Sequence, residues 1–288
     1  MYYLLYSLLY LLSLLPFGVL YVLSDLLCFF LHRVFRYRMD EIEQNLFASF
    51  PEWTAEERHR VIKDYYHNLC DSVVETIKLL SVSRRVLEKR MKGNWDVFEI
   101  MQQKSRNAQA LIAHQFNWEW ATVLTNWQLP EQFTGLYLPL NNKHFNRLMK
   151  HIRMRAGMKL VKVQDMQNQL AVIQSSPVLW GFIADQNPSD PRRVSWNRFM
   201  NRTTAFFKGP EFVARRYNNL VYFGEIIRIR RGYYEVKLKL AFDNSRETSE
   251  GEITERYVRF LEESIKRQPA NWVWSHRRWK HQPPQTSS

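Results

Sequence analysis

Hydrophobic positions dominate the start of the chain without interruption. Residues 1–31 contain a single charged side chain, Asp25, and a bilayer core requires ~20 apolar residues for a helical span. We therefore predict a transmembrane or membrane-embedded anchor helix over residues 1–31, which Pro16 and Gly18 could bend. A cleaved signal peptide fits less well, because no basic segment precedes the stretch and no small-residue cleavage site follows it. A buried helix of a soluble protein is the remaining alternative.

After residue 31 the pattern becomes amphipathic. Thr54 and Glu57 have the spacing of a capping box, which predicts a helix that begins there and ends near Leu80. The apolar stripe predicted for this helix consists of Val61, Tyr65, Leu69 and Val73. The polar face predicted opposite to it carries Arg58, Lys63 and Asp71.

Short apolar runs then alternate with helical patterns. The pattern predicts strands at 108–113, 133–138, 158–163 and 178–184, and helices near 95–103, 117–127, 142–154 and 165–175. Two longer runs, at 220–229 and 233–240, predict an antiparallel hairpin, and a last helix follows at 252–266. This alternation indicates an α/β fold, with a mixed, largely parallel sheet flanked by helices. We expect one domain over 32–280 and a loose polar tail at 281–288.

Charge adds an orientation and a class of partner. The chain has 41 Lys and Arg against 28 Asp and Glu, a formal charge of +13. Arg33, Arg36 and Arg38 directly follow the apolar stretch, so the positive-inside rule predicts that residues 33–288 lie on the cytoplasmic side of the membrane. We expect a membrane with anionic lipids as a partner. Nucleic acid is not expected, because no helix-turn-helix, zinc-finger or RRM-type signature is present.

His114 is the strongest candidate for a catalytic histidine. It follows the predicted strand 108–113, and reactive groups gather at the carboxyl ends of strands in α/β sheets. Two carboxylates could orient it, namely Glu119 and Asp185, which follows the predicted strand 178–184. On one continuous helix His114 and Glu119 would diverge by ~140°, so they can meet only if His114 lies outside the helix. A buried histidine that caps a helix is the structural alternative.

Other common catalytic elements are missing from the sequence. There is no GxSxG, GxxxxGK[ST], GxGxxG or HExxH motif. The two cysteines exclude a disulfide scaffold and a Cys-rich zinc module. Cys28 lies in the apolar stretch and Cys70 in a predicted helix, which are poor positions for a nucleophile.

The order of several motifs resembles the lipid A late acyltransferases, the lauroyl and myristoyl transferase family of the lysophospholipid-acyltransferase-like superfamily. An N-terminal anchor and the H-x4-E sequence 114–119 are followed by LPLNN at 138–142, RMRAG at 153–157, ADQNP at 184–188, the segment 199–210, and PANWVWSHRRWK at 269–280. Met200 and Asn201 depart from the small residues usual at that point. The resemblance covers most of residues 1–280.

This resemblance implies acyl transfer from a thioester on acyl carrier protein or coenzyme A to a hydroxyl of a lipid A-type or related lipid. His114 would take the hydroxyl proton, and Glu119 or Asp185 would hold the imidazole. Direct attack by the hydroxyl requires no enzyme nucleophile, and we expect no resident cofactor or metal. Arg155 or a backbone N–H near Asn117 could stabilise the oxyanion.

Several interpretations remain open from the sequence. Arg147, Arg153 and Arg155 could bind a phosphate of the acceptor or carrier, or form an ordinary solvated helix face. The segment 272–280 could contact the membrane or the carrier, or plug the fold with packed tryptophans and paired arginines. The alternative functions are a lysophospholipid or amino-lipid acyltransferase with the same dyad and a non-catalytic protein that binds anionic lipid.

Overall fold

The computed structural model of the chain describes residues 1–129, 133–170, 177–188 and 194–283. Its strands are β1 (Met91–Gly93), β2 (Ala108–Ile112), β3 (Phe133–Tyr137), β4 (Lys159–Lys162), β5 (Leu179–Ile183), β6 (Val194–Phe199), β7 (Arg202–Phe207), β8 (Leu220–Arg230) and β9 (Tyr233–Phe242). The α-helices are α1 (Tyr2–Leu14), α2 (Phe17–Phe29), α3 (Met39–Ser49), α4 (Ala55–Lys78), α5 (Arg84–Arg90), α6 (Glu99–Gln103), α7 (Trp118–Gln128), α8 (Lys143–Met154), α9 (Met166–Leu170), α10 (Gly209–Tyr217) and α11 (Glu252–Arg267). A π-helical turn covers Phe30–Val34, and 3₁₀ turns cover Trp95–Phe98, Val163–Asp165, Ser245–Glu247 and Pro269–Asn271.

The main sheet confirms the predicted fold class. Seven strands lie in the order β1-β9-β8-β2-β5-β3-β4. Strands β8, β2, β5, β3 and β4 pair in parallel, whereas β9 is antiparallel to β8, as predicted for the hairpin. The four predicted central strands begin and end within two residues of the observed ones. Of the predicted helix 165–175, residues 171–175 lie outside the described residues, as do residues 284–288 of the predicted tail.

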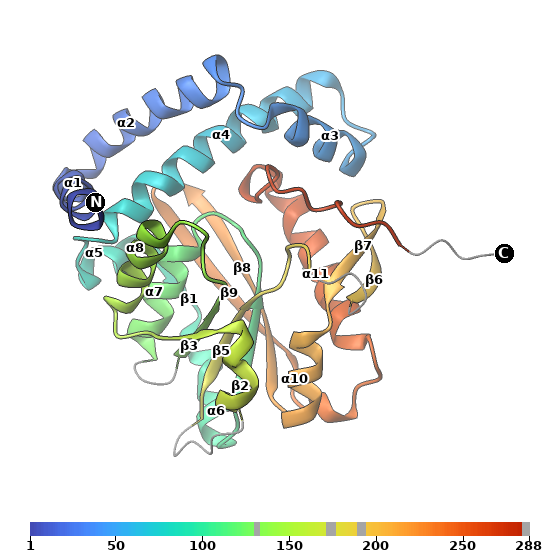
Figure 1. Ribbon diagram of the computed structural model, residues 1–288. Coiled ribbons are helices and arrows are strands. Elements are labelled where there is room, and N and C mark those ends of the chain that lie inside the picture. The colour runs from blue at the N-terminus through green and yellow to red at the C-terminus, as the bar shows by residue number, and fades with distance from the viewer. Residues whose placement is uncertain (130–132, 171–176, 189–193, 284–288) are drawn as a thin grey trace.

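Both faces of the sheet are covered by helices, which produces two separate apolar cores (Figure 1). Because side chains alternate across a strand, Leu111 and Phe223 pack in one core, which includes side chains of α10 and α11. Ala110 and Tyr222 pack in the other core with side chains of α7 and α8. Strands buried on both faces are nearly continuous in hydrophobicity, which explains why short apolar runs marked them in the sequence.

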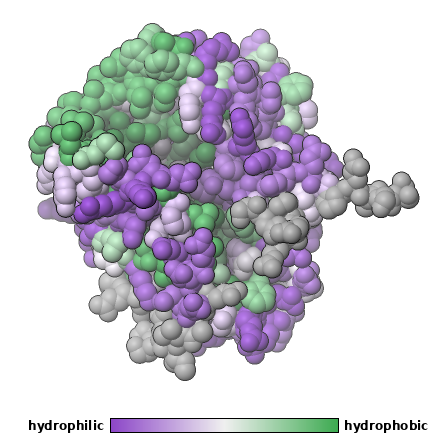
Figure 2. Space-filling view, in the orientation of Figure 1, coloured by the Kyte–Doolittle hydropathy of each residue, from purple (hydrophilic) through white to green (hydrophobic). Residues whose placement is uncertain are grey.

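The apolar N-terminus is helical as predicted, and the helix breaks at Pro16. Leu15 and Pro16 both have extended backbone angles, with ψ of 145° and 150°. Proline lacks an N–H group and disfavours helical angles in the residue before it, so α1 ends and α2 begins at this point. The two helices and α4 form an outer layer (Figure 1). Figure 2 shows hydrophobic surface gathered over α1 and α2.

Helix α4 confirms the predicted capping box but not the whole predicted stripe. Thr54 Oγ1 accepts from the Glu57 N–H at 3.2 Å, and the Glu57 carboxylate accepts from the Thr54 N–H at 2.8 Å. The predicted face was wrong at two positions, because Asp71 is fully buried while Val73 is 40% exposed. Asp71 is buried because it pairs with Arg228 and Arg231 of the hairpin.

A second, two-stranded sheet was not predicted. Strands β6 and β7 pair antiparallel, with Phe199 opposite Arg202, so the loop between them contains only Met200 and Asn201. Both loop residues have positive φ, 49° and 65°, as two-residue type I′ hairpin turns require. Asparagine tolerates this conformation well, and a polar residue here marks a turn.

Candidate active site

His114 and Asp185 meet because two parallel strands are neighbours. In the register of β2 and β5, Ile112 lies opposite Ile183, and each functional residue follows its strand by two positions. His114 Nδ1 lies 2.6 Å from Asp185 Oδ1, and the His114 backbone N–H donates to Asp185 Oδ2 at 2.9 Å. Of the two carboxylates that the sequence offered, the structure brings Asp185 to the histidine.

Three donors hold the Asp185 carboxylate, which is only 1% exposed. Besides both groups of His114, the indole N–H of Trp272 donates to Oδ2 at 2.7 Å. Burial by itself raises the pKa of Asp185, but the charge of His114 and the hydrogen bonds from His114 and Trp272 outweigh it and lower the pKa below its usual value. The carboxylate is therefore ionised and fixed in position.

The second ring nitrogen of His114 is available for chemistry. Its side chain retains 18% of its surface exposed. Across the described part of the chain, no hydrogen bond involves Nε2. The Trp118 ring lies edge-on to the imidazole, with ring centroids 5.1 Å apart. Since Nδ1 faces the carboxylate, Nε2 is the atom that can accept a proton from a bound molecule.

Glu119 has a different partner from the one its spacing suggested. It lies in the first turn of α7, outside hydrogen-bond reach of His114, and forms a bidentate pair with Arg153 at 2.6 and 2.9 Å. Glu119 Oε1 also accepts from the Trp118 indole N–H at 3.1 Å. Burial alone lowers the pKa of Arg153, but Glu119 raises it overall. The pair supports the tryptophan that flanks the imidazole.

The other predicted binding residues lie apart from the dyad. Asn117 is buried, caps α7, and donates to Glu75 Oε2 at 2.7 Å. Arg147 is exposed and stacks on the Tyr2 ring, with its guanidinium carbon 4.1 Å from the ring centroid. Arg155 donates to the carbonyls of Leu79 and Val82 at 2.5 and 2.8 Å. Within the described residues no hydrogen bond joins any of the three to His114, and Arg155 satisfies carbonyls in the turn that follows α4.

Glu75 is a buried carboxylate that the sequence analysis missed. Its two oxygens accept from Tyr21 and Tyr234 at 2.8 Å each and from Asn117 at 2.7 Å. Burial raises the pKa of Glu75 to about 7, although the tyrosine hydrogen bonds oppose it. The signal was its spacing from Asp71, because two acids at i and i+4 repel on a helix unless other elements supply partners.

The C-terminal segment is a structural plug, one of the two interpretations that its sequence allowed. Trp272 and Trp274 are buried in the core, and Trp272 reaches the dyad. Arg277 pairs with Glu41 at 3.6 Å, as that interpretation supposed. Arg278 is buried, and within the described residues it has no salt bridge; it donates to Asn187 and to the Ala205 carbonyl.

Burial also sets the charge of His276, which lies in the same segment. It lowers the pKa of His276 to about 4, with Arg278 and His114 acting in the same direction and Asp185 against them. His276 is therefore neutral at physiological pH. His114 remains the histidine with a carboxylate partner at this end of the sheet.

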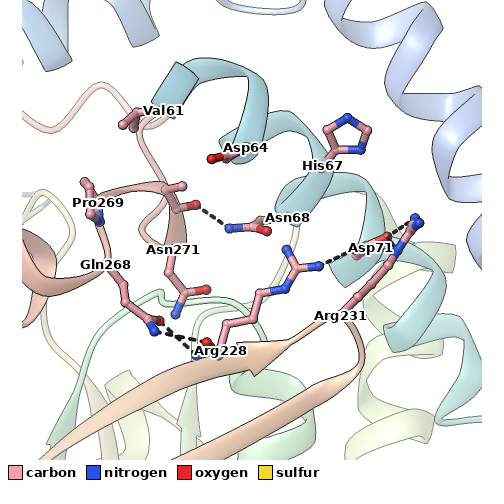
Figure 3. A pocket seen from close by; sticks show the side chains of 11 residues that line it. Val61, Asp64, His67, Asn68, Asp71, Arg228, Arg231, Gln268, Pro269 and Asn271 are labelled. Atoms are coloured by element: carbon pink, nitrogen blue, oxygen red, sulfur yellow. Dashed lines mark hydrogen bonds and ion pairs between the residues drawn. The ribbon is translucent and has the colours of Figure 1, made fainter. Parts of the chain in front are cut away.

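A separate cavity of about 440 Å³ lies between α4, β8 and the turn Pro269–Asn271 (Figure 3). Its lining residues are Val61, Asp64, His67, Asn68, Asp71, Arg228, Arg231, Gln268, Pro269, Ala270 and Asn271. The guanidinium groups of Arg228 and Arg231 both pair with Asp71 at 2.7 Å (Figure 3). Neither member of the dyad lines this cavity, so the candidate active site rests on the geometry around His114.

Comparison with protein families gives one match. Residues 1–281 match a family model described as bacterial lipid A biosynthesis acyltransferase. No curated protein matches the chain. The match covers the apolar N-terminus, the dyad and the C-terminal plug together.

Proposed function

The chain belongs to the bacterial lipid A biosynthesis acyltransferase family, and from this membership we propose that it moves a fatty acyl chain from a thioester to a hydroxyl of a lipid A-type acceptor. The family makes the chain an acyltransferase enzyme. The observation that carries the chemical part of the proposal is the 2.6 Å contact between His114 Nδ1 and Asp185 Oδ1, with Nε2 left open.

In the proposed reaction, His114 acts as a general base. Nε2 takes the proton of the acceptor hydroxyl as its oxygen attacks the thioester carbonyl. A C–O bond forms, the C–S bond breaks, and the imidazolium returns the proton to the departing thiolate. The ester and a free thiol are the products, so no enzyme nucleophile and no redox partner take part. Asp185 stabilises the imidazolium and keeps the proton of the neutral ring on Nδ1.

Trp272, Trp118 and the pair Glu119–Arg153 are positioning residues in this proposal. Trp272 fixes the carboxylate through its indole N–H. Glu119 and Arg153 hold Trp118 against the imidazole. Because a base must be held within hydrogen-bond reach of the hydroxyl, small shifts of these supports should reduce the rate.

The proposal includes acyl carrier protein or coenzyme A as the donor and the cytoplasmic face of the inner membrane as the location. Both donors end in a phosphorylated thiol arm, and the chain offers a formal charge of +13 to anionic groups. Exposed cations next to the apolar N-terminus, Arg33 and Arg36, favour a leaflet that contains anionic lipid. Arg147 is exposed beside α1 and can meet a phosphate of the acceptor or of the carrier.

The test is acyl transfer by the purified protein and its His114→Ala variant. Each is supplied in parallel with acyl carrier protein and coenzyme A thioesters, and with a lipid A-type or a lysophospholipid acceptor. We expect transfer to the lipid A-type acceptor and its loss in the variant, while His59→Ala, a change at an exposed histidine of α4, retains it. Preferred use of the lysophospholipid would contradict the acceptor class, and normal turnover by folded His114→Ala would contradict the mechanism.

A further inference from the structure

The two N-terminal helices each divide lengthwise into a bound face and an exposed apolar face. On α2, the buried residues Leu20, Ser24 and Cys28 face the protein. On its other side, apolar side chains at helical spacing are 45 to 67% exposed, namely Val19, Val22, Leu26 and Phe29. Such a division is the pattern of a helix that lies at a boundary between two media.

Helix α1 continues the same division. Tyr2, Tyr6 and Leu9 pack against the core beneath it. Leu4, Leu8 and Leu11 are among the exposed apolar side chains on its other side. We call these seven exposed residues, a subset of the exposed apolar side chains of α1 and α2, the apolar surface: Leu4, Leu8, Leu11, Val19, Val22, Leu26 and Phe29. Figure 2 shows hydrophobic surface over these two helices.

Polar contacts fix the bound face of α2 along its length. Tyr21 donates to Glu75 at 2.8 Å, and Ser24 donates to Asp71 at 2.7 Å. Asp25 pairs with Arg231 at 2.7 Å. These contacts tie α2 to α4 at Tyr21 and Ser24, and to the β8–β9 hairpin at Asp25.

The break between the helices is also fixed. The Lys78 ammonium donates to the carbonyls of Ser13 and Leu15 at 2.7 and 2.9 Å, and Ser81 donates to the Ser13 carbonyl at 2.6 Å. These carbonyls lie at the end of α1, where a helix leaves backbone acceptors without partners. Residues of the folded body therefore satisfy the backbone at the point where α1 turns into α2.

These contacts distinguish a helix α2 that spans the membrane from one that lies flat on the membrane surface. With the π-helical turn, α2 extends over 18 residues and is the one helical segment in the described part of the chain with the length and composition to cross a bilayer. To cross it, α2 would have to leave α4 or carry Asp71, Glu75 and Arg231 into the hydrocarbon. Charged groups are expensive there. Contact through the apolar surface alone breaks none of the bonds.

We propose that α1 and α2 form a monotopic docking surface that inserts its apolar side chains into a single leaflet. The occupant is an anionic lipid leaflet, because cations lie at both ends of the apolar surface. Arg147 stacks on Tyr2 at the start of α1, and Arg33 and Arg36 are exposed just after α2. Apolar side chains in the acyl region with cations at the head groups is the arrangement of interfacial amphipathic helices.

The N-terminus and the catalytic body then lie on the same side of the membrane. A spanning anchor would instead place the N-terminus on the opposite side from residues 33–288. The inference rests on the membrane association in the proposed function, but it is independent of the acyl-transfer chemistry. The side on which the N-terminus lies is therefore the decisive observation.

The experiment labels one cysteine at a time from one side of the membrane. The full-length chain is expressed with a polar, cysteine-containing extension before Met1, or with Ser249→Cys, an exposed position on the body. Both native cysteines are buried and serve as the background. Sealed spheroplasts expose the outer face and inverted vesicles the cytoplasmic face to a membrane-impermeant maleimide. We expect both sites to label in inverted vesicles only.

If the N-terminal site is labelled in spheroplasts and Ser249→Cys in inverted vesicles, the N-terminal segment spans the membrane. This result would overturn the docking inference but not the membrane association. Recovery of the protein in the soluble fraction would overturn the membrane association as well.

A second experiment uses vesicles of anionic lipid, where Val22→Asp together with Leu26→Asp should reduce flotation of the protein with the vesicles at least tenfold. The matched control is Val73→Asp, an exposed apolar position of α4. An equal loss in that control would refute the assigned surface.

Discussion

Replacing Asp185 by asparagine tests the proposed dyad with the smallest change in shape. The carboxylate accepts from His114 Nδ1 at 2.6 Å, from the His114 backbone at 2.9 Å and from Trp272 at 2.7 Å. An amide has one oxygen to accept with, and its NH₂ group can only donate. Asp185→Asn therefore removes the negative charge and allows the imidazole to turn or to adopt the other tautomer.

The charge effect can be worked from the contact distance. With the atoms 2.6 Å apart, the charge centres of imidazolium and carboxylate lie about 4 Å apart, and at an effective dielectric constant of about 20 their attraction is about 4 kcal/mol. This stabilisation exists only when the ring is protonated during proton transfer. Since 1.36 kcal/mol corresponds to about tenfold in rate, Asp185→Asn should lower kcat about 10³-fold. Loss of tautomer control adds to this, as it does in Ser-His-Asp enzymes.

The assay measures kcat and KM for acyl transfer from the thioester donor to the lipid A-type acceptor. We expect the loss in kcat, with KM within about threefold, because Asp185 acts on the base and not on the acceptor. The matched control is Asp243→Asn, which alters a 48% exposed carboxylate that pairs with Arg106 at 3.2 Å. Circular dichroism and thermal unfolding establish that both variants fold.

Two results would refute this reasoning. A folded Asp185→Asn protein that loses less than about tenfold in kcat would show that the carboxylate does not support the base. A loss of the same size in Asp243→Asn would show that the assay reports general destabilisation. Glu119→Gln adds a comparison, since its carboxylate pairs with Arg153 and not with His114. It should therefore leave more activity than Asp185→Asn.

Three further outcomes are expected. Trp272→Phe retains the packed ring but removes the N–H that Asp185 accepts at 2.7 Å, so kcat should fall about tenfold, in line with ~1.5 kcal/mol for a hydrogen bond to a charged group; unchanged kcat would remove Trp272 from the site. Arg155→Ala exposes the end of α4 and should reduce the free energy of unfolding by ~1–2 kcal/mol with kcat within about threefold, whereas a selective loss of kcat would return it to the site. Folding raises the pKa of Glu75 from 4.5 to about 7, so the free energy of unfolding should fall by about 3 kcal/mol as the pH rises from 4.5 to 7. Asp71 and Arg228 face this group. In urea unfolding, the free energy of unfolding of Glu75→Gln should depend less steeply on pH than that of the unchanged protein.

The sequence by itself determined most strands of the main sheet and the position of the base. Periods of two and 3.6 residues are local properties, so β2, β5 and the β8–β9 hairpin were predicted to within a few residues. The capping box of Thr54 and Glu57 was likewise decided within four residues of chain. Parallel strands in an α/β pattern then placed His114 at a carboxyl edge, where reactive groups gather.

The partner of His114 was decided only by strand order. Glu119 is five positions away in the chain, yet Asp185 is the neighbour, because β5 inserts beside β2 and their register brings Ile112 opposite Ile183. A hydrophobic pattern indicates which strands form, but several strand orders satisfy the same pattern. His114 and Asp185 are 71 residues apart in the chain. The pairing of strands in the sheet brings them together, and no local sequence pattern indicates this contact.

Tertiary packing also decided which charged side chains are buried. Periodicity assigned Asp71 to a polar, solvent-facing side of α4, whereas α2 and the β8–β9 hairpin cover it and provide Ser24, Arg228 and Arg231 as partners. The same packing holds α2 flat against the body, although its composition alone equally fits a membrane span. Apolar residues in a sequence specify that the face of the helix which carries them is removed from water. Whether protein or lipid covers that face depends on contacts between segments that are distant in the chain.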